Sequence, residues 1–163
     1  MDRTLIRARA TDVTGPFGVG LQLFERMLDI YEVSETKCMP AMGCKGQIGP
    51  MLALRHWPTH IWVVGESVMP VEGAIDISHG HAVLRLRGPG ALHFLADYTS
   101  ADLRATKVRN AGTLRCALGH YAVVLWWDIT RDVHIAVERS VAQSLVDHLK
   151  LLVQRRLPLD HLD

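Results

Sequence analysis

The sequence contains few cysteines, little net charge and no long apolar run. Its three cysteines, Cys38, Cys44 and Cys116, are an odd number in a chain that opens without a hydrophobic leader, so we expect reduced thiols rather than disulfides. The formal net charge of +1 at pH 7 provides no overall field for nucleic acid or an anionic membrane. No apolar run approaches the ~20 residues that a membrane-spanning helix needs. The sequence therefore predicts a cytoplasmic protein with no nucleic-acid and no membrane partner.

Motifs of several common enzyme classes are missing as well. The glycines of segment 15–20 resemble a phosphate-binding loop, but no Gly-Lys-Ser/Thr follows them and no strand is expected before them. No dinucleotide-binding Gly-x-Gly-x-x-Gly and no nucleophile motif of the form Gly-x-Ser-x-Gly occurs. We expect segment 15–20 to be a turn that interrupts regular structure, in a chain that holds no dinucleotide.

Apolar residues are plentiful, at 48% of the 163 residues. A chain of this length and composition buries a substantial core. Charged residues make up only 21%, below the roughly 25% that is typical of soluble domains. We expect apolar surface to remain exposed after one core is filled, and such surface indicates a protein partner.

The clearest local pattern is a strand, a tight turn and a helix between His81 and Ala96. Apolar residues alternate over 81–87, as in a strand with one face on a core. Gly88 and Pro89 end that strand, and apolar residues at helical spacing begin at Ala91. This unit predicts mixed α and β structure.

The remaining signals extend this pattern along the chain. Strands are predicted at 51–54, 60–65, 113–118, 121–127 and around 133–137. Ser140 is predicted to cap a long last helix that Pro158 ends. The order of elements predicts an α+β fold, with an antiparallel sheet, helices on one face and a ferredoxin-like or split βαβ half.

The first fifty residues carry weaker signals. Five apolar residues of segment 21–31 recur at helical spacing and predict an amphipathic helix. Segment 33–50 has the composition of a loop with apolar side chains. It either packs as a satellite cluster on the chain's own core or forms an arm that reaches another subunit. We therefore divide the chain into residues 1–50, an N-terminal helix and Gly/Pro-rich arm, and residues 51–163, an α+β domain.

Three groups of polar residues are candidates for chemistry. His79 and His81 lie on one face of an extended segment, but no further ligand follows at a recognised spacing, so a polar turn is favoured over a metal site. Cys38 and Cys44 lack the spacing of a zinc knuckle. Asp76 is expected to form a turn with Ser78, whose side chain bonds nearby backbone, and Asp102 is expected to close a helix end in the same manner. We therefore expect no catalytic, cofactor-binding or metal-binding residue in this chain.

The four tryptophans raise a question of packing. Trp126 and Trp127 are adjacent in a predicted strand and must point to opposite faces. One of them needs a neighbour beyond the first core, which is either a helix of the same chain or another subunit. Trp57 and Trp62 raise the same question, although all four are most simply core residues.

The order of these motifs resembles the folate-binding aminomethyltransferase superfamily. The matching residues are Asp76, Ser78, Gly88, Pro89, Ala91, Leu95, Ser100, Asp102 and Leu103. Within that superfamily the chain is most similar to the gamma subunit of heterotetrameric sarcosine oxidase and to the small subunit of N-methylglutamate dehydrogenase, which continue with a strand pair and a Val-x-Arg-Ser segment, as here at 137–140. The resemblance covers roughly residues 54–153.

The resemblance implies a small subunit that is not catalytic alone, in a complex that oxidises an N-methyl amine such as sarcosine. It implies that residues 51–163 form a gamma-like domain with the layout of an aminomethyltransferase subdomain. FAD, FMN, NAD, tetrahydrofolate and zinc would be held by a large folate/NAD-domain subunit, a flavin-binding subunit and a small zinc subunit. Two alternatives remain, a free-standing folate-binding protein and an unrelated ferredoxin-like binding module.

Overall fold

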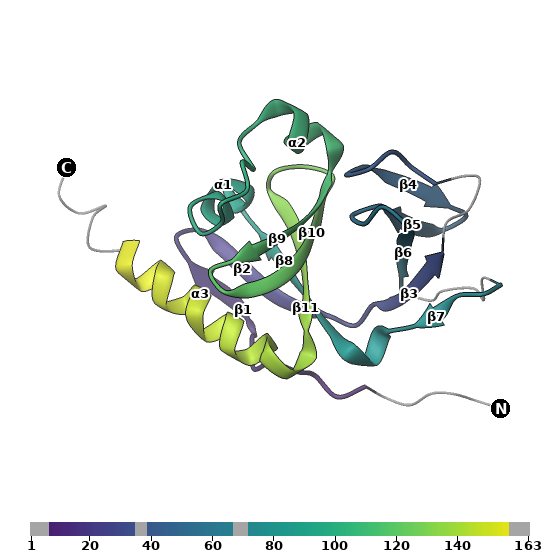
Figure 1. Cartoon of the computed structure of the whole chain (residues 1–163). Helices are drawn as coiled ribbons and strands as arrows, with labels where there is room; N and C mark the ends of the chain where they lie inside the picture. Colours follow the sequence, from purple (N-terminus) through teal and green to yellow (C-terminus); the bar gives the residue numbers. More distant parts are fainter. Residues whose placement is uncertain (1–6, 35–38, 67–71, 157–163) are drawn as a thin grey trace.

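A computed structural model describes residues 7–34, 39–66 and 72–156 of the chain, and Figure 1 shows two antiparallel sheets flanked by helices. We call the six-stranded sheet with order β1-β2-β8-β11-β10-β9 sheet A, and the five-stranded sheet with order β4-β5-β6-β3-β7 sheet B. The α+β fold class is confirmed. Among the described residues, none of the helices has the length and apolar character needed to cross a membrane.

The elements have the following bounds. Sheet A consists of β1 (Gly15–Gly18), β2 (Leu21–Arg26), β8 (His81–Arg87), β9 (Thr113–Leu118), β10 (Tyr121–Trp127) and β11 (Asp132–Glu138). Sheet B consists of β3 (Asp29–Ser34), β4 (Lys45–Ile48), β5 (Met51–Leu54), β6 (His60–Gly65) and β7 (Ile75–Asp76). The helices are α1 (Ala91–Ala96), α2 (Thr106–Ala111) and α3 (Ala142–Arg156), and two 3-10 turns are η1 (Ser78–Gly80) and η2 (Arg139–Val141). The strands predicted from residue 51 onward are confirmed, as are the helix after Pro89 and the long last helix.

Sheet A is the middle layer of the molecule. On one face, alternate residues of its strands pack with α1 and α3 in the largest core, which includes Leu84, Leu125, Phe94 and Leu149. On its other face, the intervening residues pack against sheet B in a second core. A sheet covered on both faces buries both sets of alternating side chains, which explains why β10 is almost continuously apolar.

The tryptophan pair of β10 divides between these two cores. Trp127 lies in the core beneath the helices, and Trp126 lies in the core between the sheets. The expected neighbour of the second tryptophan is therefore neither a helix nor another subunit, but a second sheet of the same chain. Trp62 is buried in the same core, whereas Trp57 is 41% exposed.

The helix predicted over 21–31 is wrong, because this segment forms two strands, β2 and β3. Leu21 and Leu23 are buried on one face of sheet A, and the chain then turns at Met27–Leu28 and enters sheet B with Ile30 buried. Odd-numbered residues are buried in β2, whereas the even-numbered Leu28 and Ile30 are buried where the chain enters sheet B. Two strand patterns joined with this one-residue shift have apolar residues spaced as in a helix.

The expectation that segment 15–20 interrupts regular structure is also wrong in part. Gly15–Gly18 forms β1, which pairs with β2 and has an irregular register between Pro16 and Gly18. Positive φ angles at Gly15, Gly18 and Gly20 let the strand bulge and then turn tightly into β2.

The segment after β3 packs on the chain's own core. Met39 and Ile48 contact a third cluster formed by buried residues of sheet B, among them Val33, Met51 and Ile61. This is the first of the two alternatives for segment 33–50. Strands on both sides of residue 50 pair with one another, since β4 lies beside β5.

Ser140 does not cap α3 as predicted. It lies inside η2, an extra turn that precedes α3, and no side-chain cap is present on Glu138 at the start of that turn. The expected stop at Pro158 lies outside the described residues.

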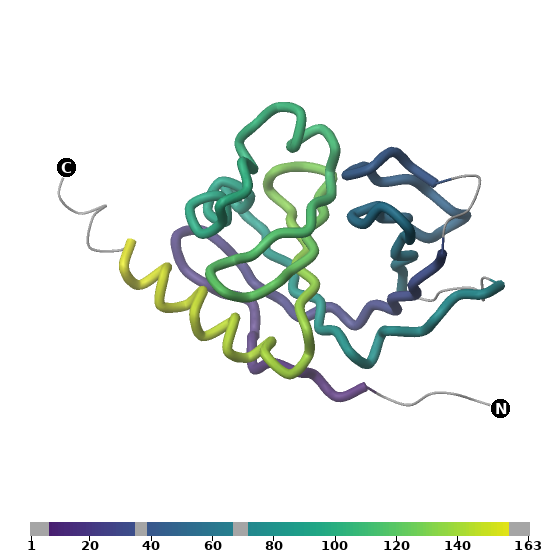
Figure 2. The backbone as a smooth tube through the Cα atoms, in the orientation of Figure 1, coloured from purple at the N-terminus to yellow at the C-terminus, as the bar shows by residue number. Residues whose placement is uncertain are grey.

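The N-terminal segment runs past the start of α3 and is bonded to it (Figure 2). The Arg139 guanidinium donates to the Ala8 carbonyl, and the Gln143 amide bonds Asp12 at 2.9 Å. The buried Glu25 carboxylate of β2 accepts hydrogen bonds from the Ala10 and Thr11 amides at 2.8 and 2.9 Å. A buried charge needs such partners, so the N-terminal segment is part of the fold.

The turn at Gly88 lies against the turn at Gly20, and substitution of Gly88 tests this close approach. A Cβ at Gly88 would lie 2.5 Å from the Gly20 carbonyl oxygen, at a φ of +135°. We expect Gly88→Ala to lower the free energy of unfolding by about 2–4 kcal/mol. Gly90→Ala is the control, because its φ is +73° but no atom lies within 4 Å, and about 1 kcal/mol is expected. Urea denaturation measures both, and equal losses would contradict the close approach.

Candidate functional site

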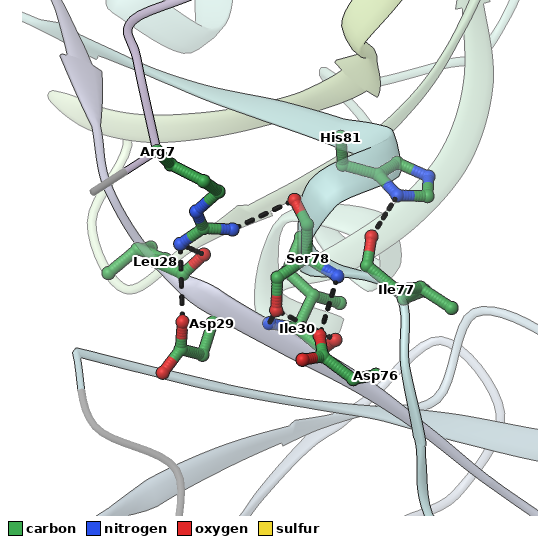
Figure 3. A network of polar contacts seen from close by, with 8 residues as sticks. All are labelled: Arg7, Leu28, Asp29, Ile30, Asp76, Ile77, Ser78 and His81. Carbon is green, nitrogen blue, oxygen red and sulfur yellow. Dashed lines mark hydrogen bonds and ion pairs between the residues drawn. The ribbon is translucent and has the colours of Figure 1, made fainter. Parts of the chain in front are cut away.

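The two sheets are joined by a network of polar contacts centred on Ser78 (Figure 3). Its buried hydroxyl accepts a hydrogen bond from the Ile30 amide at 2.8 Å and lies 3.3 Å from the Ile30 carbonyl oxygen, to which it donates. The Ile77 amide donates to the same carbonyl at 2.9 Å. We call this set of contacts the Ser78 joint. It fixes the segment that enters β8 of sheet A against β3 of sheet B.

The Ser78 joint is extended by two charged residues. Asp76 accepts a hydrogen bond from the Ser78 amide at 2.9 Å. Burial alone would raise the pKa of the Asp76 carboxyl, but its hydrogen bonding with Ser78 outweighs burial and lowers that pKa. Arg7 donates to the carbonyls of Ser78 and Leu28 at 2.8 and 2.7 Å. The N-terminal segment thus contacts both connections between the sheets, the one from β2 to β3 at Leu28 and the one from β7 to β8 at Ser78.

The predicted role of Asp76 is confirmed, since it forms an Asx-type turn with Ser78. The backbone that the Ser78 side chain bonds is 48 residues away in sequence, in β3. Asp102 accepts from the Arg104 and Ala105 amides at 3.2 and 3.1 Å. It therefore shapes the loop that leads into α2 rather than the end of α1.

Beside the Ser78 joint lies a cleft between the sheets, with a volume of about 790 Å³. We call it the inter-sheet cleft. Its floor on sheet A is made of small or branched side chains, Ala122, Val124 and Ala136, and Trp62 of sheet B forms the opposite wall. Because these floor residues are short, the two sheets do not fill the space between them at this end. A volume of this size lies within the range of about 300–1,000 Å³ that ligand pockets have.

The rim of the inter-sheet cleft carries charges of both signs. Glu32 and Glu138 lie on it, together with Arg115, His81 and His120. His60 Nε2 is 3.4 Å from Glu32, whereas His81 donates from Nδ1 to the Ile77 carbonyl at 3.1 Å. The Arg115 guanidinium lies over the Trp57 ring, 4.7 Å from its centroid. Among the described residues, Arg115 forms no ion pair with a carboxylate, so its charge is available to an incoming group.

A buried histidine supports the wall of the cleft from behind. His56 is 4% exposed, and in the described parts of the chain neither of its ring nitrogens has a hydrogen-bond partner. Its ring meets the edge of the Trp62 ring at 4.5 Å between centroids. Burial, reinforced by the positive charge of Arg115, lowers the pKa of His56 to about 4. His56 is therefore neutral near pH 7.

The other candidate residues do not assemble into a reactive group. His79 is exposed and His81 is bound to the Ile77 carbonyl. Cys44 and Cys116 are free thiols, and burial raises the pKa of Cys116; Cys38 lies outside the described residues. In the parts of the chain that the structure describes, no three histidine, cysteine, aspartate or glutamate side chains gather at a distance suited to a metal ion.

The inter-sheet cleft was not among the sequence-based predictions. Its residues come from β3, β6, β9, β10, β11 and α3, and no sequence pattern connects them. The available signal was the small size of Ala122 and Ala136, which stand on the sheet B face of two strands where large side chains are usual.

Removing the Ser78 hydroxyl should weaken the joint between the sheets. In Ser78→Ala the buried Ile30 amide loses its partner, and we expect a loss of about 2–3 kcal/mol in the free energy of unfolding. Ser140→Ala is the control, because Ser140 is exposed and should change stability by about 0.5 kcal/mol or less. Urea denaturation followed by tryptophan fluorescence compares the two, and equal effects would show that the Ser78 joint contributes nothing.

Acid should destabilise the protein through two histidines. Burial is the main cause that lowers the pKa of His56 and of His134 to about 4, below the ordinary histidine pKa of about 6.5 that holds in the unfolded chain. The unfolded state therefore binds more protons between these values, and stability falls as pH drops from about 6.5 toward 4. We expect each histidine to contribute on the order of 2 kcal/mol to this loss.

Phenylalanine at these positions keeps the aromatic packing and removes the titration. Thermal unfolding between pH 7 and 4.5 should show a smaller loss in His56→Phe and the smallest loss in the double variant with His134→Phe. An unchanged pH slope in the double variant would contradict this explanation.

Comparison with known proteins places the fold. No protein-family profile matches the sequence, and a comparison with curated proteins finds no match. Among solved structures, a chain of heterotetrameric sarcosine oxidase from Corynebacterium sp. U-96, in complex with pyrrole 2-carboxylate, superposes with a TM-score of 0.70 at 19% sequence identity. The superposition covers 90% of this chain and 88% of the matched chain. This chain therefore has the fold of a chain from a heterotetrameric sarcosine oxidase.

Proposed function

We propose that this protein is a non-catalytic, gamma-like small subunit of a cytoplasmic heteromeric flavoprotein that oxidises an N-methyl amine such as sarcosine. The observation that carries the proposal is the fold likeness, which extends over nine-tenths of both chains. Chains that match over similar shares are of similar length, so the likeness is to a small chain of a heterotetramer. Sequence motifs over residues 54–153 resemble the gamma subunit independently of the coordinates.

The geometry of the chain supports a bracing role rather than chemistry of its own. The polar contacts of the Ser78 joint are saturated by backbone and by one another, as structural contacts are. Partner subunits supply the chemistry in this proposal: a large folate/NAD-domain subunit, a flavin-binding subunit and a small zinc subunit, with FAD, FMN, NAD, tetrahydrofolate and zinc. Tetrahydrofolate takes up the one-carbon unit there. Exposed apolar side chains such as Trp57 and Ile129 provide contact area for such partners.

Affinity purification of the full-length chain from its own cells tests the proposal. We expect larger chains to co-purify in fixed ratio, with the visible absorbance of bound flavin, and the preparation to oxidise sarcosine or a related N-methyl amine. The rate of release of free formaldehyde should fall when tetrahydrofolate is added. The matched control compares the oxidation activity of cells that lack the gene with that of the same cells after the gene is restored.

Two results would overturn the proposal. A lone monomer that tetrahydrofolate stabilises against heat would favour a free-standing folate-binding protein. A lone monomer without flavin, without partners and without response to folate would favour an unrelated binding module.

A further inference from the structure

Strand β9 is an edge strand with little of the usual protection against pairing, since Arg115 is its only charged residue. The four edges of the two sheets are β1, β9, β4 and β7. β1 contains Pro16 and a register shift, β4 has four residues including Lys45, and β7 has only two residues. Proline, bulges, charges and short length all discourage the addition of another strand. β9 has six residues in unbroken register with β10 and contains no proline.

The hydrogen-bond pattern shows which groups of β9 point outward. The Trp127 amide donates to the Gly112 carbonyl, one residue beyond the last pair of the β9 and β10 register, which is Trp126 opposite Thr113. In an antiparallel ladder, bonded pairs alternate with unbonded ones. Thr113, Arg115 and Ala117 therefore direct their amides and carbonyls away from β10. The Thr113 amide confirms this direction, because it donates to the Gly43 carbonyl at 3.3 Å.

Beyond Thr113 the edge is open. Among the described residues, no backbone group outside the ladder of sheet A bonds the amides or carbonyls of Arg115 and Ala117. Both side chains face sheet B, because Arg115 pairs with Val124 of the core between the sheets. The open edge of β9 thus lies along the inter-sheet cleft, with Arg115 stacked on the half-exposed Trp57 at its mouth.

We propose that the open edge of β9 is a docking site for an extended segment of a partner polypeptide, which adds a seventh strand to sheet A and places a carboxylate opposite Arg115. Backbone bonds to Arg115 and Ala117 supply affinity, and the inter-sheet cleft receives alternate side chains of the added strand. Tryptophan and arginine are the residues that most often dominate binding energy at interfaces. The proposal rests on the proposed function, in that the partner is another chain of the flavoprotein.

A second copy of this chain fits the edge poorly. Antiparallel self-pairing through the open residues would set Arg115 opposite Arg115 or Ala117 of the other copy. Both registers bring the two guanidinium groups onto the same face of adjacent strands, where like charges are destabilising. An acidic segment of a different chain avoids this repulsion.

Two variants and a control test the site in the assembled protein. Arg115→Glu reverses the charge at the edge, and Ala117→Pro removes one outward amide without breaking the ladder to β10. We expect each to reduce the yield of co-purified partner chains about tenfold or more, since every 1.4 kcal/mol is a factor of ten in affinity. Arg155→Glu makes the same change of charge on the exposed side of α3 and should co-purify like the wild type.

Hydrogen exchange of the wild-type complex tests the edge without any substitution. The amides of Arg115 and Ala117 should exchange slowly in the complex, as slowly as those of the paired strand β10. Fast exchange there, or normal assembly of both variants, would overturn the docking site and leave the proposed function standing. Failure of the wild-type chain to co-purify with any flavoprotein chain would overturn both. A homodimer in which the β9 edge is protected from exchange would overturn the proposal that the partner is a different chain, and would favour a second copy of this chain.

Discussion

The fold depends on the contact between the Ser78 hydroxyl and both backbone groups of Ile30. The chain passes between the two sheets twice near this point, once from β2 to β3 and once from β7 through η1 to β8. Fixing the two crossings to each other sets where sheet B lies over sheet A. The core between the sheets, with Trp62 and Trp126, can then form only in one register. Arg7 adds the N-terminal segment to the same point.

This arrangement leaves sheet A covered on one face by α1 and α3 and on the other by sheet B, but not along its whole length. At the end marked by Ala122 and Glu138 the sheets separate into the inter-sheet cleft. Glu25 and Thr113 are buried with hydrogen-bond partners. Arg55 Nε and both ring nitrogens of His56, behind the cleft wall, are buried without a partner among the described residues. Trp57, Arg115 and the edge of β9 meet at the mouth of this cleft, and this is the surface that we propose as a docking site.

The sequence predicted the second half of the fold well and the first half poorly, for a physical reason. Between His81 and Glu138 each strand is an alternating or continuous apolar segment with turn signals at its ends, so local patterns suffice. In segment 21–31 the alternation changes phase where the chain changes sheets, and the composite spacing imitated a helix. The second sheet was not predicted, because it is formed by pairing between strands far apart in the sequence, which local patterns do not reveal. Adjacent Trp126 and Trp127 did indicate that both faces of β10 are covered. The turn of Asp76 and Ser78 was predicted from local chemistry, but its partner Ile30 and the inter-sheet cleft depend on residues far apart in the sequence.

This chain has the fold of a chain from a heterotetrameric sarcosine oxidase, and we have proposed that it braces larger flavin-bearing chains. Native mass spectrometry of the protein isolated from its own cells tests this account most directly. The account predicts a single assembly in which this 18.2 kDa chain is one component beside larger chains with bound flavin. A spectrum containing only the free chain, or only copies of it, would contradict the account.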